Sequence, residues 1–77
     1  MNTLLSIGIP TWNRSKYLSE LLEELTNQII SSNLNIEVVI SDNASTDSTP
    51  NLVQEFKRRY DFIQYYRNSE NLGSDIN

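Results

Sequence analysis

Apolar positions along the chain follow two different spacings in turn, which predicts that strands and helices alternate. Residues 4–9 form a short, mostly apolar run that ends at Pro10, and such a run is typical of a buried strand rather than an amphipathic one. From Arg14 onward the apolar side chains recur every three or four residues, as they do along one face of a helix. These side chains are Leu18, Leu21, Leu22, Leu25 and Ile29. The polar residues 31–33 end the helical pattern.

The same succession repeats in the second half of the chain. Residues 36–40 are the apolar run of a second strand, and the polar stretch 41–49 separates it from a second helix. The apolar stripe of that helix is Leu52, Val53, Phe56 and Tyr60. Residues 62–66 are aromatic and β-branched, which favours a third strand, and residues 67–73 have the composition of a turn.

Polar side chains stand where both helices are expected to begin. The candidate N-caps are Asn13 or Ser15 for the first helix and Asp47, Ser48 or Thr49 for the second. Pro50 falls in the first turn of the second helix, where a missing amide hydrogen costs nothing. The cations at residues 57–59 fall in its last turn and complement the negative end of the helix dipole.

Strands that alternate with helices imply right-handed βαβ units and a parallel sheet. We therefore predict an α/β fold, a three-layer Rossmann-like βαβαβ unit with local strand order 3-2-1. The strand-to-helix loops of a parallel sheet lie at its carboxyl edge, so residues 10–13, 41–48 and 67–73 should share one rim. Ligands of open α/β sheets bind at this rim, and the polar stretch 41–49 is expected to form one wall of a ligand crevice.

Composition narrows the chemistry that such a rim can perform. The 77 residues make one small, partial domain, and its net charge of −4 argues against a nucleic-acid partner. The absence of both cysteine and histidine excludes disulfides, thiolate zinc sites and imidazole catalysis. There is no secretory leader pattern and no long apolar segment, so we expect a cytoplasmic chain.

Known nucleotide motifs are missing from the first strand-to-helix turn, which reads P-T-W-N-R. That turn lacks the G-x-G-x-x-G of dinucleotide folds, the P-loop sequence and the acidic pair of receiver domains. The rim offers instead an indole at Trp12, a carboxylate at Asp42 and a cation at Arg67. A nucleoside suits these groups, because its base can stack on the ring and donate an N–H to the carboxylate.

Three segments together resemble the amino-terminal, nucleotide-binding part of family 2 glycosyltransferases. They are SIGIPTWNR at 6–14, EVVISDNASTDST at 37–49 and RNSENLG at 67–73. The resemblance implies a GT-A fold and transfer of a sugar from a nucleotide-sugar donor, with UDP-sugar the expected donor. The expected acceptor is a glycan or a lipid-linked molecule in cell-surface polysaccharide synthesis. A divalent cation, Mn or Mg, is implied for the full-length enzyme.

The resemblance also assigns nucleotide-binding residues. They are Pro10, Thr11, Trp12, Asp42, Asn43, Arg67 and Gly73. Trp12 stands where the family more often has tyrosine, and Asp42 matches the carboxylate that contacts the base or ribose. Asn71 and Gly73 match the turn into the next helix, and Asn77 matches an asparagine of a subgroup that acts on surface polysaccharides.

Two parts of the family's machinery have no counterpart in these 77 residues. The metal-binding D-x-D follows the family's fourth strand and the catalytic base lies further on, so no catalytic or metal-binding residue is assigned. We expect a fragment or truncated product that is inactive by itself. We expect any attachment of the protein to the inner face of a membrane to be made by downstream segments that are missing from these 77 residues. The first strand is interior in the family's sheet, so the isolated chain should self-associate through residues 4–9 or be partly molten.

Structural interpretations stay open for the same side chains. Asp42, Asn43 and Asp47 suit Asx-turns and helix capping, with the capping role favoured for Asp47. Trp12 suits simple packing as well as base stacking, and Gly73 suits a positive φ. Tyrosines 17, 65 and 66 are expected to pack only. The alternative function is a non-catalytic remnant or protein-interaction module with weak or no nucleotide binding.

Overall fold

The computed structural model describes residues 5–68, which form strands and helices in the predicted alternating order. The strands are β1 (Leu5–Thr11), β2 (Ile36–Asp42) and β3 (Ile63–Arg67), and the helices are α1 (Ser15–Ser32) and α2 (Thr49–Arg59). The strands are parallel and lie in the order β1-β2-β3, which is the predicted 3-2-1 order. The α/β prediction is confirmed.

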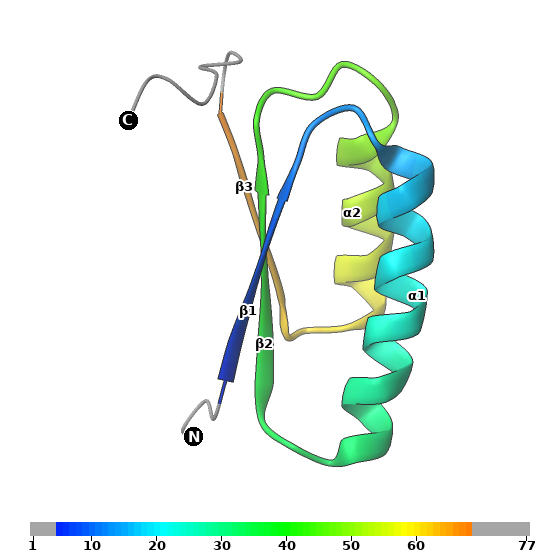
Figure 1. The fold of residues 1–77 in the computed structure, drawn as a ribbon, viewed down its shortest axis with the longest axis vertical. Coiled ribbons are helices and arrows are strands. Elements are labelled where there is room, and N and C mark those ends of the chain that lie inside the picture. The colour runs from blue at the N-terminus through cyan, green and yellow to red at the C-terminus, as the bar shows by residue number, and fades with distance from the viewer. Residues whose placement is uncertain (1–4, 69–77) are drawn as a thin grey trace.

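Both helices cover the same face of the sheet (Figure 1). Two successive right-handed crossovers that step in one direction across a sheet must place both connecting helices on one side. The described residues therefore supply a sheet layer and one helix layer. In residues 5–68, no helix is long and apolar enough to cross a membrane.

The first two strands extend two residues further than expected. The sequence placed the ends at Ile9 and Ile40, but the pairing of the two strands continues through Thr11 and Asp42. A proline at position 10 is compatible with this extension because β1 is an edge strand of the described sheet, where proline is tolerated. The first two residues of the polar stretch 41–49 are thus part of β2 rather than of the loop.

The prediction of a buried first strand is wrong for the described residues. Leu5 is 53% exposed, Ser6 and Gly8 are exposed, and Ile7 and Ile9 are only partly buried. Successive side chains of a strand point to opposite faces, and the helices cover one face only.

The core lies between the sheet and the two helices. Its buried apolar side chains are Leu18, Leu22, Ile29, Val38, Ile40, Val53, Phe56 and Ile63. The helical stripes predicted from the three- and four-residue spacing supply the helix half of this core, with Leu25 and Leu52 packed at its border.

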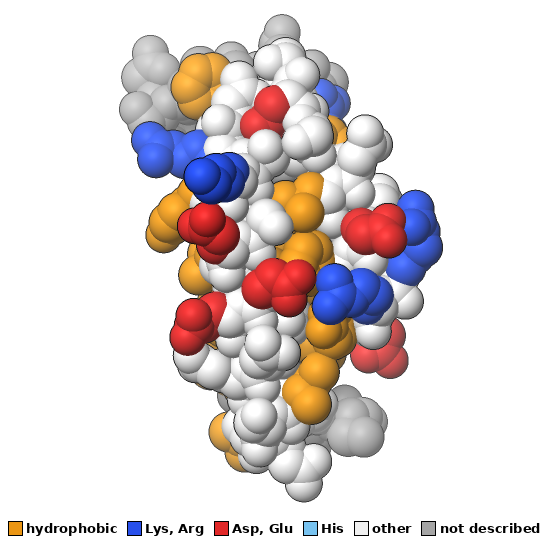
Figure 2. All heavy atoms as spheres, turned by 90° about the vertical axis from the view of Figure 1, so that its right-hand side faces the viewer, with side chains coloured by type: hydrophobic (Ala, Val, Ile, Leu, Met, Phe, Trp, Pro, Cys, Tyr) orange, Lys and Arg blue, Asp and Glu red, His pale blue; other side chains and the backbone are white. Residues whose placement is uncertain are grey.

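The outer face of the helices carries acidic and basic side chains among other polar and some hydrophobic ones (Figure 2). Arg59 of α2 lies 3.7 Å from the Glu23 carboxylate of α1, and Arg58 pairs with Glu55 one turn earlier. All four side chains are largely exposed, so these pairs contribute little to stability. The basic residues 57–59 occupy the last turn of α2, as predicted.

Leu22 and Leu34 provide a matched test of the core. Leu22 is fully buried, whereas Leu34 is 56% exposed. We expect Leu22→Ala to lower the free energy of unfolding by about 2–5 kcal/mol, because it leaves a cavity. Leu34→Ala should change it by less than about 0.5 kcal/mol. Denaturant titration measures both, and equal effects would show that the core is assigned incorrectly.

The edge of β1 yields a second prediction. Within residues 5–68, β1 pairs with β2 along one side only. Because an open strand edge recruits other strands, we predict that the 77-residue chain sediments as dimers or larger species. Gly8→Lys should reduce this association, since a Cβ at position 8 meets no atom within 4 Å and charge protects an edge. A monodisperse wild-type monomer would contradict the prediction.

Candidate functional site

Three of the predicted site residues form one row across the carboxyl edge of the sheet. In the strand register, Thr11 of β1 pairs with Asp42 of β2, and Asp42 pairs with Arg67 of β3. The backbone N–H of Asn43 donates to the carbonyl of Thr11 at 3.0 Å, which continues the β1–β2 contact into the loop. Segments far apart in sequence therefore meet at the rim where ligands of open α/β sheets bind.

A surface hollow of about 310 Å³ opens beside this row. Four of the predicted residues line it, namely Pro10, Thr11, Trp12 and Asn43, together with Arg14. Its volume is at the lower end of the range of ligand sites. Trp12 is 50% exposed, so its ring is available at the surface rather than held in the core.

The Asp42 carboxylate lies behind the rim and is almost completely buried. Its Oδ1 accepts hydrogen bonds from the Ser45 backbone N–H (3.0 Å) and from the Ser45 hydroxyl (2.6 Å). Its Oδ2 accepts a hydrogen bond from the Tyr65 hydroxyl and lies 3.8 Å from Nε of Arg67. A buried carboxylate needs such partners, because an unpaired charge out of water is strongly unfavourable.

Tyr65 was expected to serve only for packing, but its hydroxyl belongs to the polar network. Burial of the ring, and then the hydrogen bond and the negative charge of Asp42, raise the pKa of Tyr65 well above the ordinary tyrosine value. The hydroxyl therefore stays protonated and remains a donor at neutral pH. The parallel register could have indicated this role. Tyr65 pairs with Ile40, and Ile40 and Asp42 are two residues apart on one strand, so Tyr65 lies on the same face of the sheet as Asp42.

Arg67 and Asn68 connect the third strand to the second loop. Nη2 of Arg67 donates to the backbone carbonyl of Ser45 at 2.8 Å. The Asn68 backbone N–H donates to the carbonyl of Asp42 at 2.9 Å, and its side-chain amide donates to Oδ1 of Asn43 at 3.1 Å. The rim is therefore held together by hydrogen bonds that link all three strands.

Comparison with known proteins now identifies the family. The model of glycosyl transferase family 2 matches residues 6–77, almost the whole chain. The chain belongs to glycosyltransferase family 2. The predicted resemblance is confirmed.

Two curated relatives of this family 2 chain are much longer than the segment that it matches. It is 52% identical over 75 residues to abequosyltransferase RfbV of Salmonella typhimurium. This match covers 96% of the chain and 22% of the relative. It is 33% identical to the GalNAc(5)-diNAcBac-PP-undecaprenol beta-1,3-glucosyltransferase of Campylobacter jejuni, over 83% of the chain and 20% of the relative. The chain thus spans about a fifth of the length of these proteins.

A solved structure supports the predicted GT-A fold. Mannosyltransferase PcManGT from Pyrobaculum calidifontis, in complex with GDP-Man and Mn2+, matches with a TM-score of 0.77 and 25% identity. The match covers 96% of the family 2 chain and 22% of the mannosyltransferase. In residues 5–68 of our chain, no group of three or more acidic, histidine or cysteine side chains is arranged to hold a metal.

Asn13 of the family 2 chain joins two rim loops instead of capping α1. The cap position is Arg14, without a side-chain cap bond, so neither Asn13 nor Ser15 is the N-cap. Asn13 has a positive φ of 48°, which asparagine adopts more readily than most residues. Its Oδ1 accepts from the backbone N–H groups of Thr46 (2.7 Å) and Asp47 (3.3 Å), and its own N–H donates to Oγ of Ser45 (2.9 Å).

Asp47 contacts the first turns of both helices with one carboxylate. Oδ2 accepts from the Ser15 N–H of α1 at 3.2 Å, and Oδ1 accepts from the N–H and hydroxyl of Thr49 in α2. Ser48 occupies the N-cap position of α2 and Pro50 lies in its first turn. The N-cap of α2 is therefore Ser48, without a side-chain cap bond, and not Asp47. The Asp47 carboxylate lies one residue earlier and accepts hydrogen bonds from the first residues of both helices.

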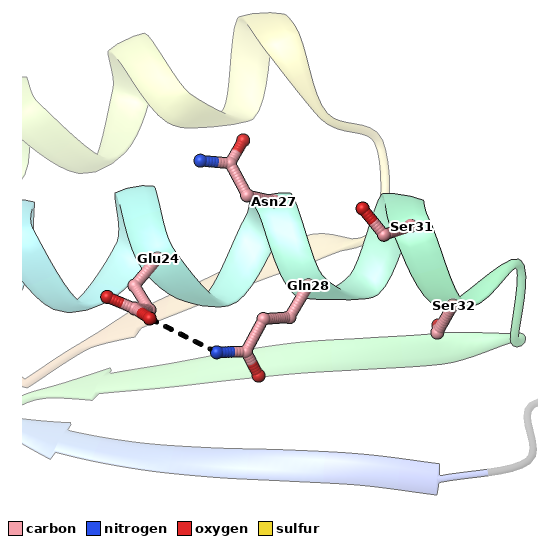
Figure 3. A pocket seen from close by; sticks show the side chains of 5 residues that line it. All are labelled: Glu24, Asn27, Gln28, Ser31 and Ser32. Atoms are coloured by element: carbon pink, nitrogen blue, oxygen red, sulfur yellow. Dashed lines mark hydrogen bonds between the residues drawn. The ribbon is translucent and has the colours of Figure 1, made fainter.

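A larger hollow, of about 500 Å³, lies on α1 away from the rim (Figure 3). Its lining residues are Glu24, Asn27, Gln28, Ser31 and Ser32. All of them belong to one helix, and Gln28 donates to the Glu24 carboxylate at 3.3 Å. Among the lining residues that the structure describes, none comes from a second element, so the smaller hollow at the rim is the better candidate site. The predicted residues Asn71, Gly73 and Asn77 lie outside the described residues.

The Asp47 contacts predict a pH dependence of stability. The Thr49 hydroxyl is the first of several hydrogen-bond donors that lower the pKa of Asp47 in the folded chain. A lowered folded pKa stabilises the fold above the unfolded value of about 3.9, and this contribution is lost as the pH falls. We expect Asp47→Asn to lower the melting temperature at about pH 6, with the difference from wild type shrinking toward about pH 3. A difference that is constant with pH would contradict an ionic role.

Proposed function

We propose that the chain forms the nucleotide-binding part of a glycosyltransferase whose donor is a nucleotide-sugar, with a UDP-sugar as the first candidate. The observation that carries the proposal is the rim hollow beside the Thr11–Asp42–Arg67 row. In an open parallel sheet this edge is the place where nucleotide ligands bind.

The chemistry of the rim suits a nucleoside diphosphate. The half-exposed Trp12 ring offers a flat surface on which a base can stack. Asn43 and Thr11 offer polar groups to a ribose, and Arg14 and Arg67 offer positive charge near a negatively charged ligand. Asp42 is proposed to contact the base from behind the rim.

The reaction is proposed to be transfer of the sugar to a glycan or lipid-linked acceptor in cell-surface polysaccharide synthesis. The names of the Salmonella and Campylobacter relatives support this class of reaction. Both name a glycosyltransferase, and the second names an undecaprenol-linked acceptor. A divalent cation is proposed for the full-length enzyme, as in the mannosyltransferase complex with Mn2+. Within residues 5–68, no cluster of side chains is suited to hold that cation.

Trp12 and Tyr17 provide a matched pair for testing nucleotide binding. Both aromatic side chains are at least half exposed, but only Trp12 lines the hollow. We expect Trp12→Ala to weaken UDP binding about tenfold, because stacking of one base on an aromatic ring contributes roughly 1–3 kcal/mol. Tyr17→Ala should leave the affinity unchanged. Isothermal titration of the full-length protein with UDP measures both.

An amide-resolved NMR titration with UDP, and then with other nucleoside diphosphates, locates the contact. Saturable shifts are expected at Thr11, Trp12 and Asn43, around the hollow. If no nucleotide causes saturable shifts, the proposal fails and the alternative, a non-catalytic protein-interaction module, is favoured.

A further inference from the structure

The hydrogen bonds of Asp42 leave its carboxylate with one acceptor position to spare. A carboxylate has about four such positions, two on each oxygen. Ser45 fills both positions of Oδ1, with its N–H and its hydroxyl, and Tyr65 fills one position of Oδ2. Nε of Arg67 is 3.8 Å from Oδ2, which is too long for a hydrogen bond. Among residues 5–68, no hydrogen-bond donor therefore takes the remaining position of Oδ2.

Tyr65 and Arg67 differ in their freedom to move away from this oxygen. The Tyr65 ring packs against the hydrophobic core, which fixes its hydroxyl beside Asp42. A tyrosine hydroxyl carries its proton at neutral pH, and burial raises the pKa of Tyr65 further, so its hydroxyl can donate to Asp42. The Arg67 side chain is 40% exposed and is tied by one hydrogen bond to the Ser45 carbonyl. A ligand reaching Asp42 would thus displace Arg67 rather than Tyr65.

Bases differ in how many adjacent N–H donors they present to a carboxylate. Guanine offers two, at N1 and N2, which match two open acceptor positions side by side. Uracil, thymine and cytosine each offer one donor group next to an acceptor. The donor of such a base matches the one open acceptor position of Asp42, and the acceptor of the base matches an N–H of the nearby Arg67.

We propose that Tyr65 is a specificity-determining positioning residue, which holds one acceptor position of Asp42 so that the site favours pyrimidine over guanosine diphosphates. The inference rests on the proposed function, since it assumes that Asp42 contacts the base. It assigns no contact with the ligand to Tyr65 itself. Removing the hydroxyl opens a second acceptor position and should admit the paired donors of guanine.

Tyr65→Phe and Tyr66→Phe test the proposal in the full-length protein. Tyr66 is the neighbouring residue, is 63% exposed and lies outside the network, so it is the matched control. Isothermal titration with UDP, CDP and GDP gives the ratio of affinities. We expect wild type and Tyr66→Phe to bind UDP or CDP at least about tenfold more tightly than GDP. Tyr65→Phe should narrow this preference about fivefold or more, mainly by gaining affinity for GDP.

The outcomes separate this inference from the proposed function. An unchanged ratio in Tyr65→Phe, or a wild type that prefers GDP, overturns the inference while nucleotide binding stands. Failure of wild type to bind any of the three nucleotides overturns both.

Thermal unfolding is measured for each variant. If Tyr65→Phe does not fold, Ser45→Ala replaces it, because loss of this hydroxyl opens a position on Oδ1. An unchanged ratio in Ser45→Ala then overturns the inference.

Discussion

The buried carboxylate of Asp42, at the carboxyl end of the central strand, is the group around which the rim is organised. A charge with almost no exposure must be compensated by nearby donors, and the chain supplies them from the following loop and the neighbouring strand. Ser45 is thereby held against the carboxylate, and the Tyr65 hydroxyl is directed toward it from β3. The positions of β2, its loop and β3 at this edge are consequently coupled through one side chain.

A second set of hydrogen bonds fixes the loops relative to the helices. Asn13 binds the loop after β2, and Asp47 contacts the amide groups at the start of α1 and α2. The first loop therefore takes its shape from residues about thirty positions away in sequence. Asn13 lies between Trp12 and Arg14, which both line the hollow, so its hydrogen bonds hold this part of the first loop against the loop after β2.

Membership of family 2 explains why so small a chain has an ordered rim of this kind. The parallel sheet brings its strand ends to one edge, and the helix dipoles and loop amides add positive potential there. One fold can serve many different functions, so a choice of substrate depends on individual side chains at the site rather than on the fold itself. Asp42, Tyr65 and Arg67 are the side chains of the described residues best placed for such a choice.

Much of the fold was determined by the sequence alone, because periodicity reports which side chains face a core. The helical stripes through Leu18, Leu22 and Val53, the parallel order of the strands and the shared rim of Thr11, Asp42 and Arg67 were all predicted. These features follow from two simple rules. The spacing of apolar residues determines which face of a helix or strand packs on the core, and βαβ connections are right-handed.

Only the tertiary structure decided the hydrogen bonds of individual side chains. The bond from Tyr65 to Asp42, the loop contacts of Asn13 and the double role of Asp47 join residues from separate elements, and their geometry depends on strand register to within one residue. The exposure of β1 likewise depends on which face the helices cover, which an apolar run does not specify. Sequence pattern thus gave the location of the rim, whereas packing determined which of its groups are buried, paired or accessible.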